Sequence, residues 1–248
     1  MLDTPSIRIG GFMKLLFLSL TLSILLMPKA DAKFFSIFKG KPTATKSEFL
    51  NYITKENPAG VGFDEAFFST AHWVNEFTNV VVIDKATRGL TSQSLRFYKN
   101  GQLIYTAKTS TGREQVEQER ASIFHHGPKF SYYSTTGTGY FNVSWTDIDH
   151  ESDLWKTKMP YSVFFNEGIA MHQAPIGTEN MLGKRASGGC VRLAENAASF
   201  VYEQVLDAGR GLVPTFNRMG EPVLDNAGNY VKKIGFKTLV IVVNSETR

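Results

Sequence analysis

Short runs of β-branched and aromatic residues, separated by turn residues, dominate the chain from about Val80 onward. Branched and aromatic side chains pack well on a pleated surface, so these runs predict strands rather than helices. The runs are NVVVID, SLRFYKNGQLIYTAKTST, GYFNVSW, MPYSVFFNEGIAMH and, last, KTLVIVVN. They predict a mainly β domain, which we expect to be mostly antiparallel and to close with a strand over 237–243.

Turn residues and one helical pattern divide these runs. The dipeptide Asn100-Gly101 predicts a two-residue type I′ hairpin, because that turn needs positive φ at both central positions. The residues NEG at 166–168 predict a second tight turn. The only clear helix in this half follows Cys190 in LAENAASFVYEQVLDAG, where Gly209 is a natural stop. We therefore expect a β domain with a few short helices.

The N-terminus has the three-part pattern of a secretory signal peptide. From Met13 the chain reads MKLLFLSLTLSILLMPKADA, with a basic start, an apolar stretch, a proline and a small-x-small cleavage site. The apolar stretch is shorter than the roughly 20 residues that span a bilayer. We predict a signal peptide over residues 1–32, with Met13 as an alternative start. The mature protein is then exported to the periplasm or cell envelope.

Length and composition fit one main domain. The 248 residues are 42% hydrophobic and 20% charged, as in soluble globular proteins. Residues 33–77 carry helical spacing of apolar residues in their second half, and we expect a partly helical lead-in that packs on a main domain over residues 78–248. The net charge is only +4, and no Lys/Arg block suggests a nucleic-acid groove, so we predict no nucleic-acid partner.

Cys190 is the only cysteine of the chain. Exported proteins meet an oxidising compartment and tend to pair their cysteines, which favours a working role for an unpaired one. A buried cysteine that packs as a small apolar side chain is the alternative. Composition leaves both readings open.

Local features around Cys190 favour a reactive thiol. The run Ser187-Gly188-Gly189 precedes it, and paired glycines let successive backbone N–H groups converge on a developing oxyanion. The helix predicted about one turn downstream places the thiol near a helix N-terminus, whose dipole stabilises an anion. Arg192 adds positive charge, and His172, at the end of a predicted strand, is a candidate base. A tight turn, a surface charge and a structural histidine are the alternatives.

The stretch MPYSVFFNEGIAMHQAPIGTENMLGKRASGGCVRL resembles the signature region of the L,D-transpeptidase catalytic domain, the YkuD-like family of bacterial cell-wall enzymes. The family's conserved elements have counterparts in Met159-Pro160-Tyr161, Gly168 to His172, Leu182-Gly183, and Ser187 to Arg192. The resemblance covers residues 78–244 and implies a β-sandwich-like catalytic fold over the main domain.

The resemblance also implies a reaction. Cys190 would be the nucleophile, His172 its base, and the backbone carbonyl of Gln173 would orient the imidazole. The donor would be a peptidoglycan stem peptide, which loses D-alanine to form an acyl-enzyme and is then passed to an amine of another stem. No cofactor is implied. The residues that would contact the substrate or the oxyanion are Ser187, Gly188, Gly189 and Arg192.

Departures from the family pattern leave the acceptor open. Gly188 stands where the family usually has a histidine, and Gln173 follows the base where a small residue is common. With water as acceptor the protein is an L,D-carboxypeptidase, and with an envelope protein it handles protein–peptidoglycan links. An inactive peptidoglycan-binding module is the alternative of another class. We predict no metal site, because neighbouring strand histidines such as His125 and His126 point to opposite faces.

Overall fold

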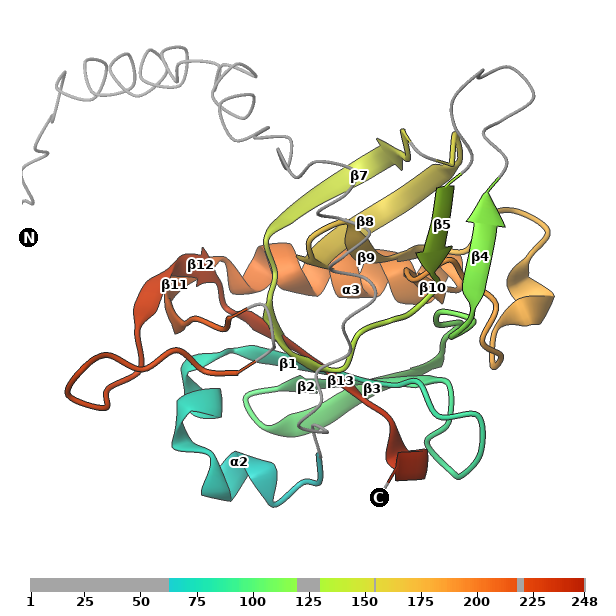
Figure 1. Cartoon of the computed structure of the whole chain (residues 1–248). Helices are drawn as coiled ribbons and strands as arrows, with labels where there is room; N and C mark the ends of the chain where they lie inside the picture. The colour runs from blue at the N-terminus through green and yellow to red at the C-terminus, as the bar shows by residue number, and fades with distance from the viewer. Residues whose placement is uncertain (1–62, 120–129, 154, 218–220, 248) are drawn as a thin grey trace, which may run out of the picture. The chain divides into compact units, whose positions relative to one another are not determined.

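The computed structural model describes residues 63–119, 130–153, 155–217 and 221–247 (Figure 1). The predicted signal peptide over 1–32, residues 33–62 of the lead-in and the histidine pair at 125–126 lie outside the described residues. No helix in the described ranges combines the length and the apolar character needed to cross a bilayer.

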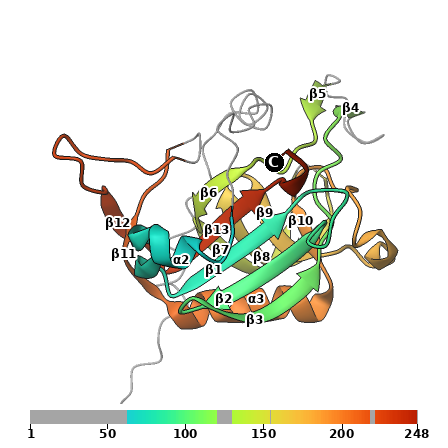
Figure 2. The same cartoon turned by 90° about the horizontal axis from the view of Figure 1, so that it is seen from below.

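The larger sheet has the strand order β3-β2-β1-β13-β6 (Figures 1 and 2). Every residue of the neighbouring strands β1 and β13 is buried, which explains their nearly continuous apolar sequences. These two strands run parallel, whereas the other pairs of the sheet are antiparallel as expected. The strands are β1 (Asn79–Asp84), β2 (Ser94–Lys99), β3 (Gln102–Lys108), β6 (Gly139–Asn142) and β13 (Thr238–Val243).

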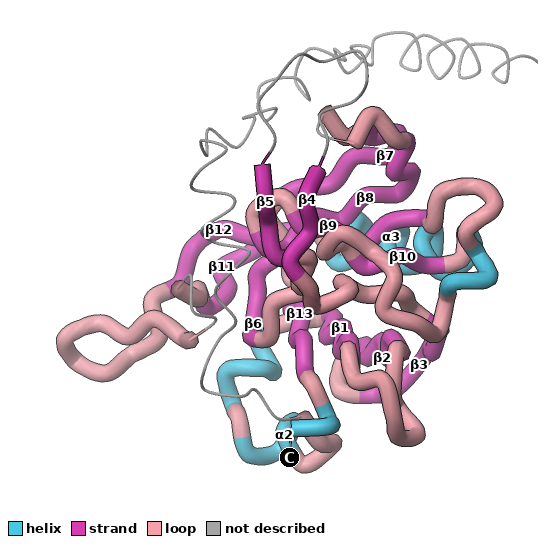
Figure 3. Tube along the Cα trace, turned by 45° about the vertical axis from the view of Figure 1, so that its right-hand side comes forward, coloured by secondary structure: helices cyan, strands magenta, loops and turns pink. Residues whose placement is uncertain are grey.

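A second sheet has the order β10-β9-β8-β7. Its strands are β7 (Trp145–Glu151), β8 (Lys158–Asn166), β9 (Ile169–Gln173) and β10 (Val191–Leu193), and β10 is parallel to β9. Two separate strand pairs complete the described β structure, as the tube in Figure 3 shows: β4 (Val116–Glu119) with β5 (Phe130–Tyr133), and β11 (Arg210–Pro214) with β12 (Lys232–Phe236).

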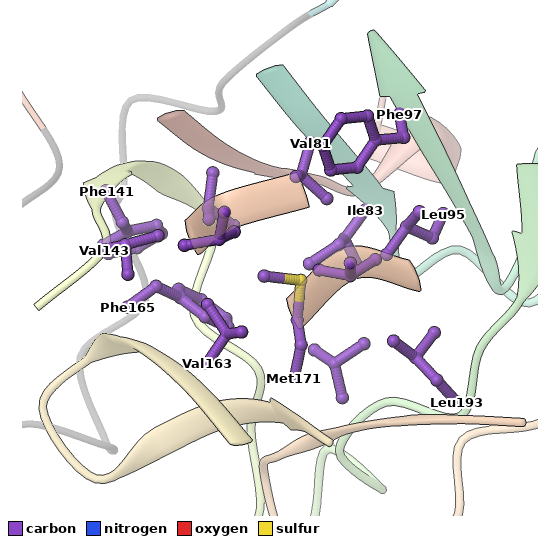
Figure 4. Close-up of a cluster of buried hydrophobic side chains, with 14 of the residues drawn as sticks. Val81, Ile83, Leu95, Phe97, Phe141, Val143, Val163, Phe165, Met171 and Leu193 are labelled. Atoms are coloured by element: carbon purple, nitrogen blue, oxygen red, sulfur yellow. The ribbon is translucent and has the colours of Figure 1, made fainter. Parts of the chain in front are cut away.

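The main hydrophobic core lies between the two sheets. Figure 4 shows Val81, Ile83 and Phe97 of the larger sheet facing side chains of the second sheet such as Val163 and Met171. Helix α3 (Glu195–Ala208) adds buried side chains to the same core and ends at Gly209, whose φ is 66°. Two sheets that face each other across one core confirm the sandwich-like, mainly β fold predicted from the sequence.

The described part of the lead-in covers the other face of the larger sheet. It contains the short helix α2 (Phe67–Thr70) and the 3-10 helix η2 (His72–Glu76). Trp73 and Phe77 are buried there in a cluster with Val80 and Leu239 of the sheet. This packing gives the aromatic residues of the lead-in a structural role.

Both predicted turns are present. Asn100 and Gly101 have φ values of 50° and 77° and join β2 to β3. Glu167, with a φ of 50°, joins β8 to β9, and the second of these turns delivers the chain into the strand that ends at His172. Turn residues therefore position the candidate base.

Candidate active site

Strands β9 and β10 bring the candidate residues His172, Cys190 and Arg192 to one face of the second sheet. In their parallel register Arg192 pairs with His172, and Val191 pairs with Met171. Side chains alternate across a strand, and Val191 and Met171 point into the core, so His172 and Arg192 point away from it. Cys190, two residues before Arg192, lies on the same side, and all three line a pocket of about 320 Å³.

The imidazole of His172 is held in its neutral form. Its side chain is only 3% exposed, and its Nδ1 lies 2.6 Å from the carbonyl oxygen of Gln173. A carbonyl oxygen can only accept, so Nδ1 carries the proton and Nε2 keeps a lone pair. Burial lowers the pKa of His172 to about 4, against the opposing effect of the Gln173 hydrogen bond. At neutral pH the ring can therefore take a proton through Nε2.

Cys190 is a neutral thiol at rest. Its Sγ donates to the carbonyl oxygen of Gly168 at 3.8 Å. Burial raises the pKa of the Cys190 thiol, while the backbone N–H of Ala170 and the charge of Arg192 act in the opposite direction. A thiol with a raised pKa needs a base to remove its proton before it can attack a carbonyl carbon. A neutral imidazole such as that of His172 can accept this proton.

The expected help from a helix dipole is absent at this thiol. Strand β10 lies between Cys190 and helix α3, which begins only at Glu195. The dipole acts within the first turn of a helix, so the prediction that Cys190 lies near a helix N-terminus, one turn before the helix, is wrong. The sequence pattern located the helix correctly but gave no sign of the three-residue strand before it.

Residues Ser187–Cys190 form a tight loop, called here the cysteine loop. The hydroxyl of Ser187 accepts the N–H of Gly189 at 3.0 Å and donates to the carbonyl oxygen of Cys190. Ser187 is fully buried, so its hydroxyl shapes the loop from within. The N–H of Gly189 is thereby engaged, whereas the N–H of Cys190 has no hydrogen-bond acceptor among the described residues.

Two aromatic side chains fill the space beside Gly188. A Cβ at this position would lie 3.3 Å from the hydroxyl oxygen of Tyr132 and 3.4 Å from Cζ2 of Trp155. Tyr132 and Trp155 pack edge to face, with ring centroids 5.4 Å apart, and both line the pocket. At this glycine, which departs from the family pattern, the aromatic side chains of two distant segments therefore pack where a Cβ would be in tight contact with them. Trp155 was not selected from the sequence, because nothing in its own stretch marks it as part of a pocket.

A polar network lies behind the cysteine loop. The hydroxyl of Thr136 donates to the carbonyl oxygen of Gly189 at 2.6 Å. The neighbouring Thr135 donates to the carboxylate of Glu114 at 2.8 Å, and this carboxylate is 3.2 Å from the ammonium of Lys85. The side chain of Lys85 is 1% exposed, so this is a buried ion pair. The sequence offered no signal for it, because Lys85 and Glu114 lie in ordinary polar stretches.

Residues 110–113 hold the loop from the side opposite β9. Ser110 pairs with Arg192, and Gly112 pairs with Ser187. A Cβ at Gly112 would lie 2.4 Å from the carbonyl oxygen of Ser134, so only glycine fits this close approach. Arg113, the next residue, lines the pocket and was not selected from the sequence.

These observations define a mainly β domain whose pocket presents a thiol, a neutral imidazole and a guanidinium. The family profile of the YkuD L,D-transpeptidase catalytic domain matches residues 78–224, more than half of the chain. The chain belongs to this family, as the resemblance in the sequence predicted. A search of curated proteins found no match.

Solved structures with a similar chain trace include three L,D-transpeptidases. The one from Xylanimonas cellulosilytica is 23% identical, with 67% of this chain and 60% of that chain covered and a TM-score of 0.42. The one from Mycobacterium smegmatis is 14% identical, with 67% and 58% covered and a TM-score of 0.39. L,D-transpeptidase 3 from Mycobacterium tuberculosis, solved with a faropenem-derived adduct, is 14% identical, with 68% and 61% covered and a TM-score of 0.42.

Proposed function

We propose that this protein is a cysteine-dependent peptidoglycan L,D-transpeptidase that acts in the cell envelope. The observation that supports this most directly is the single pocket shared by Cys190, the neutral His172 and Arg192. Family membership supports the same reaction class, and the signal-peptide pattern over residues 1–32 supports export.

The first half-reaction forms a thioester. Sγ of Cys190 attacks the carbonyl carbon of the bond between the L-centre of diaminopimelate and D-alanine, while Nε2 of His172 takes the thiol proton. The N–H of Cys190 is the open donor for the oxyanion that develops. The C–N bond then breaks, His172 returns the proton to the leaving amine, and free D-alanine departs.

The second half-reaction reverses the roles. An amine of a second stem peptide attacks the thioester, its proton passes to His172, and the thiolate of Cys190 leaves and is reprotonated. The product is a cross-link between two stems. The hydrogen bond from Nδ1 to Gln173 keeps the imidazole in the tautomer that both half-reactions use.

Mass spectrometry of the products tests the proposal. The purified protein is mixed with a disaccharide-tetrapeptide, beside Cys190→Ala and His172→Ala variants. We expect a cross-linked dimer with release of D-alanine, no product and no acyl adduct for Cys190→Ala, and a rate about 100- to 10,000-fold lower for His172→Ala. Tripeptide with D-alanine but no dimer would assign the carboxypeptidase reaction instead. Turnover that survives Cys190→Ala would overturn the mechanism.

Localisation needs its own test. We expect a tagged full-length chain to be recovered from the envelope fraction in a form shortened by the signal peptide. Deletion of residues 1–32 is expected to leave it in the cytoplasm at full activity. Recovery of the unprocessed full chain from the cytoplasm would contradict the export proposal.

A further inference from the structure

Two guanidinium groups converge at the wall of the pocket. Arg113 and Arg192 come from different segments and both line the cavity that holds Cys190. Nη1 of Arg113 donates to the carbonyl oxygen of Ala186 at 2.8 Å, and Nη1 of Arg192 points to the same oxygen at 3.4 Å. The backbone of Arg113 is also fixed, because its N–H donates to the carbonyl oxygen of Ser187. The two cations are thus held close together by the chain itself.

The charges at this place do not balance. Arg113 pairs through Nε with Glu117, whose carboxylate also accepts from Gln115 and Ser134. The hydrogen bond from Arg113 is the main reason that the pKa of Glu117 is lowered, so this carboxylate is charged. Arg192 has no carboxylate within ion-pair distance among the described residues. Two cations and one anion leave a net positive charge at the pocket wall.

Hydrogen-bond donors are also in excess there. A guanidinium offers five N–H donors. The described residues accept two from Arg113 and one from Arg192. After the effect of burial, the nearby charge of Arg113 is the next factor that lowers the pKa of Arg192. An anion bound between the two groups would remove this repulsion and fill the open donors.

We infer that Arg113, together with Arg192, forms a carboxylate-binding subsite that holds the C-terminal carboxylate of the donor peptide. This inference rests on the proposed function, in which the residue that leaves is a single D-amino acid. Its carboxylate is one carbon away from the nitrogen of the bond that breaks, so it lies next to the thiol when the donor is in place. Guanidinium groups bind carboxylates in a two-pronged geometry, which fixes the orientation of the donor. Arg113 is then a residue that selects donor peptides with a single residue after the cleaved bond.

Equilibrium binding separates this role from a structural one. Calorimetry compares the disaccharide-tetrapeptide with its C-terminal amide, using the Cys190→Ala protein so that no turnover occurs. We expect the acid to bind roughly 10- to 100-fold more tightly than the amide, the range for a hydrogen bond to a charged group. In the Cys190→Ala/Arg113→Gln protein the ratio is expected to fall below about 3-fold.

Glu117→Gln is the matched control, because it breaks the same ion pair from the other side and keeps the cation. It is expected to retain the ratio of the affinities for the peptide acid and the peptide amide. Lys184→Gln, which removes an exposed charge from the neighbouring loop, is expected to retain this ratio as well. Arg113→Lys serves as the second variant if Arg113→Gln unfolds, and it should lower the ratio while keeping some of it. An equal loss in Glu117→Gln and Arg113→Gln, an unchanged ratio in both, or no binding of either peptide would overturn the inference. A normal ratio without turnover in the wild-type protein would remove the proposed reaction and leave the subsite in place.

Discussion

The two sides of the cysteine loop are built differently. Behind it, polar contacts join Lys85, Glu114, Thr135 and Thr136, and all of these side chains are buried except that of Glu114, which is 10% exposed. In front of it, the pocket holds cationic and thiol groups with open hydrogen-bonding capacity. The polar groups that hold the backbone are engaged within the protein, whereas those that face the pocket are left for a ligand. The difference shows how one loop can have a backbone held by internal hydrogen bonds and a face that is open to a ligand.

Breaking the support behind the loop should have the largest effect. Glu114→Ala removes the carboxylate that pairs with the buried ammonium of Lys85, and breaking a buried ion pair costs about 3–5 kcal/mol of unfolding free energy. Asp207→Ala at the exposed Lys99–Asp207 pair is the control and should cost about 0–1 kcal/mol. Urea unfolding measures both. Equal effects of the two variants would show that the buried pair has no special role.

On the pocket side of the loop, His172 should make the stability of the protein depend on pH. His172 stays neutral in the folded protein down to about pH 4, whereas the unfolded residue gains a proton near its ordinary pKa of 6.5. The contribution of the neutral ring to the free energy of unfolding is therefore fully present above pH 6.5. It decreases towards pH 4, by up to roughly 3 kcal/mol. The same pKa predicts that kcat/KM keeps its value down to about pH 5. Unfolding curves of wild type and His172→Gln between pH 4 and 7 measure the difference, and parallel curves would contradict the assignment.

A smaller change tests how firmly the support is joined to the loop. Thr136→Val keeps the shape of the side chain but leaves the carbonyl of Gly189 and the N–H of Gly112 without their partner, at a cost of about 1–3 kcal/mol. We expect kcat to fall more than KM rises, because the loop that carries Cys190 loses its position. Thr136→Ser restores the hydroxyl and should restore kcat. Failure of this rescue would assign the loss to packing.

The smallest change in stability is expected for Gly188→Ala. A Cβ there meets Tyr132 and Trp155 at ordinary to tight contact distances, so Gly188→Ala should change stability by less than about 1 kcal/mol. Gly188→His adds a ring beyond this tight Cβ and is expected to lose activity, which a second change, Trp155→Ala, should partly recover. Kinetic assays of the single and double variants measure this. A fully active Gly188→His protein would show that the aromatic wall is movable.

The sequence was sufficient to predict the fold and to select Cys190 and His172, which line one pocket in the structure. The strand runs, the Asn100-Gly101 turn and the motif around Cys190 each depend on local chemistry, which neighbouring residues reveal. The parallel pairing of β1 with β13 was missed because it joins residues more than 150 positions apart. Lys85, Glu114 and Trp155 were missed for the same reason, since each acquires its role only through contacts with distant segments.

The arrangement at Gly188 also bears on how such a protein can change during evolution. Tyr132 and Trp155 lie 3.3 and 3.4 Å from the position that a Cβ at residue 188 would take. A lineage that exchanges glycine and histidine there is expected to alter the aromatic residues as well, because a side chain at position 188 begins in tight contact with both of them. The identity of residue 188 is thus tied to two positions far from it in sequence, and comparing relatives at all three together is more informative than comparing the cysteine motif alone.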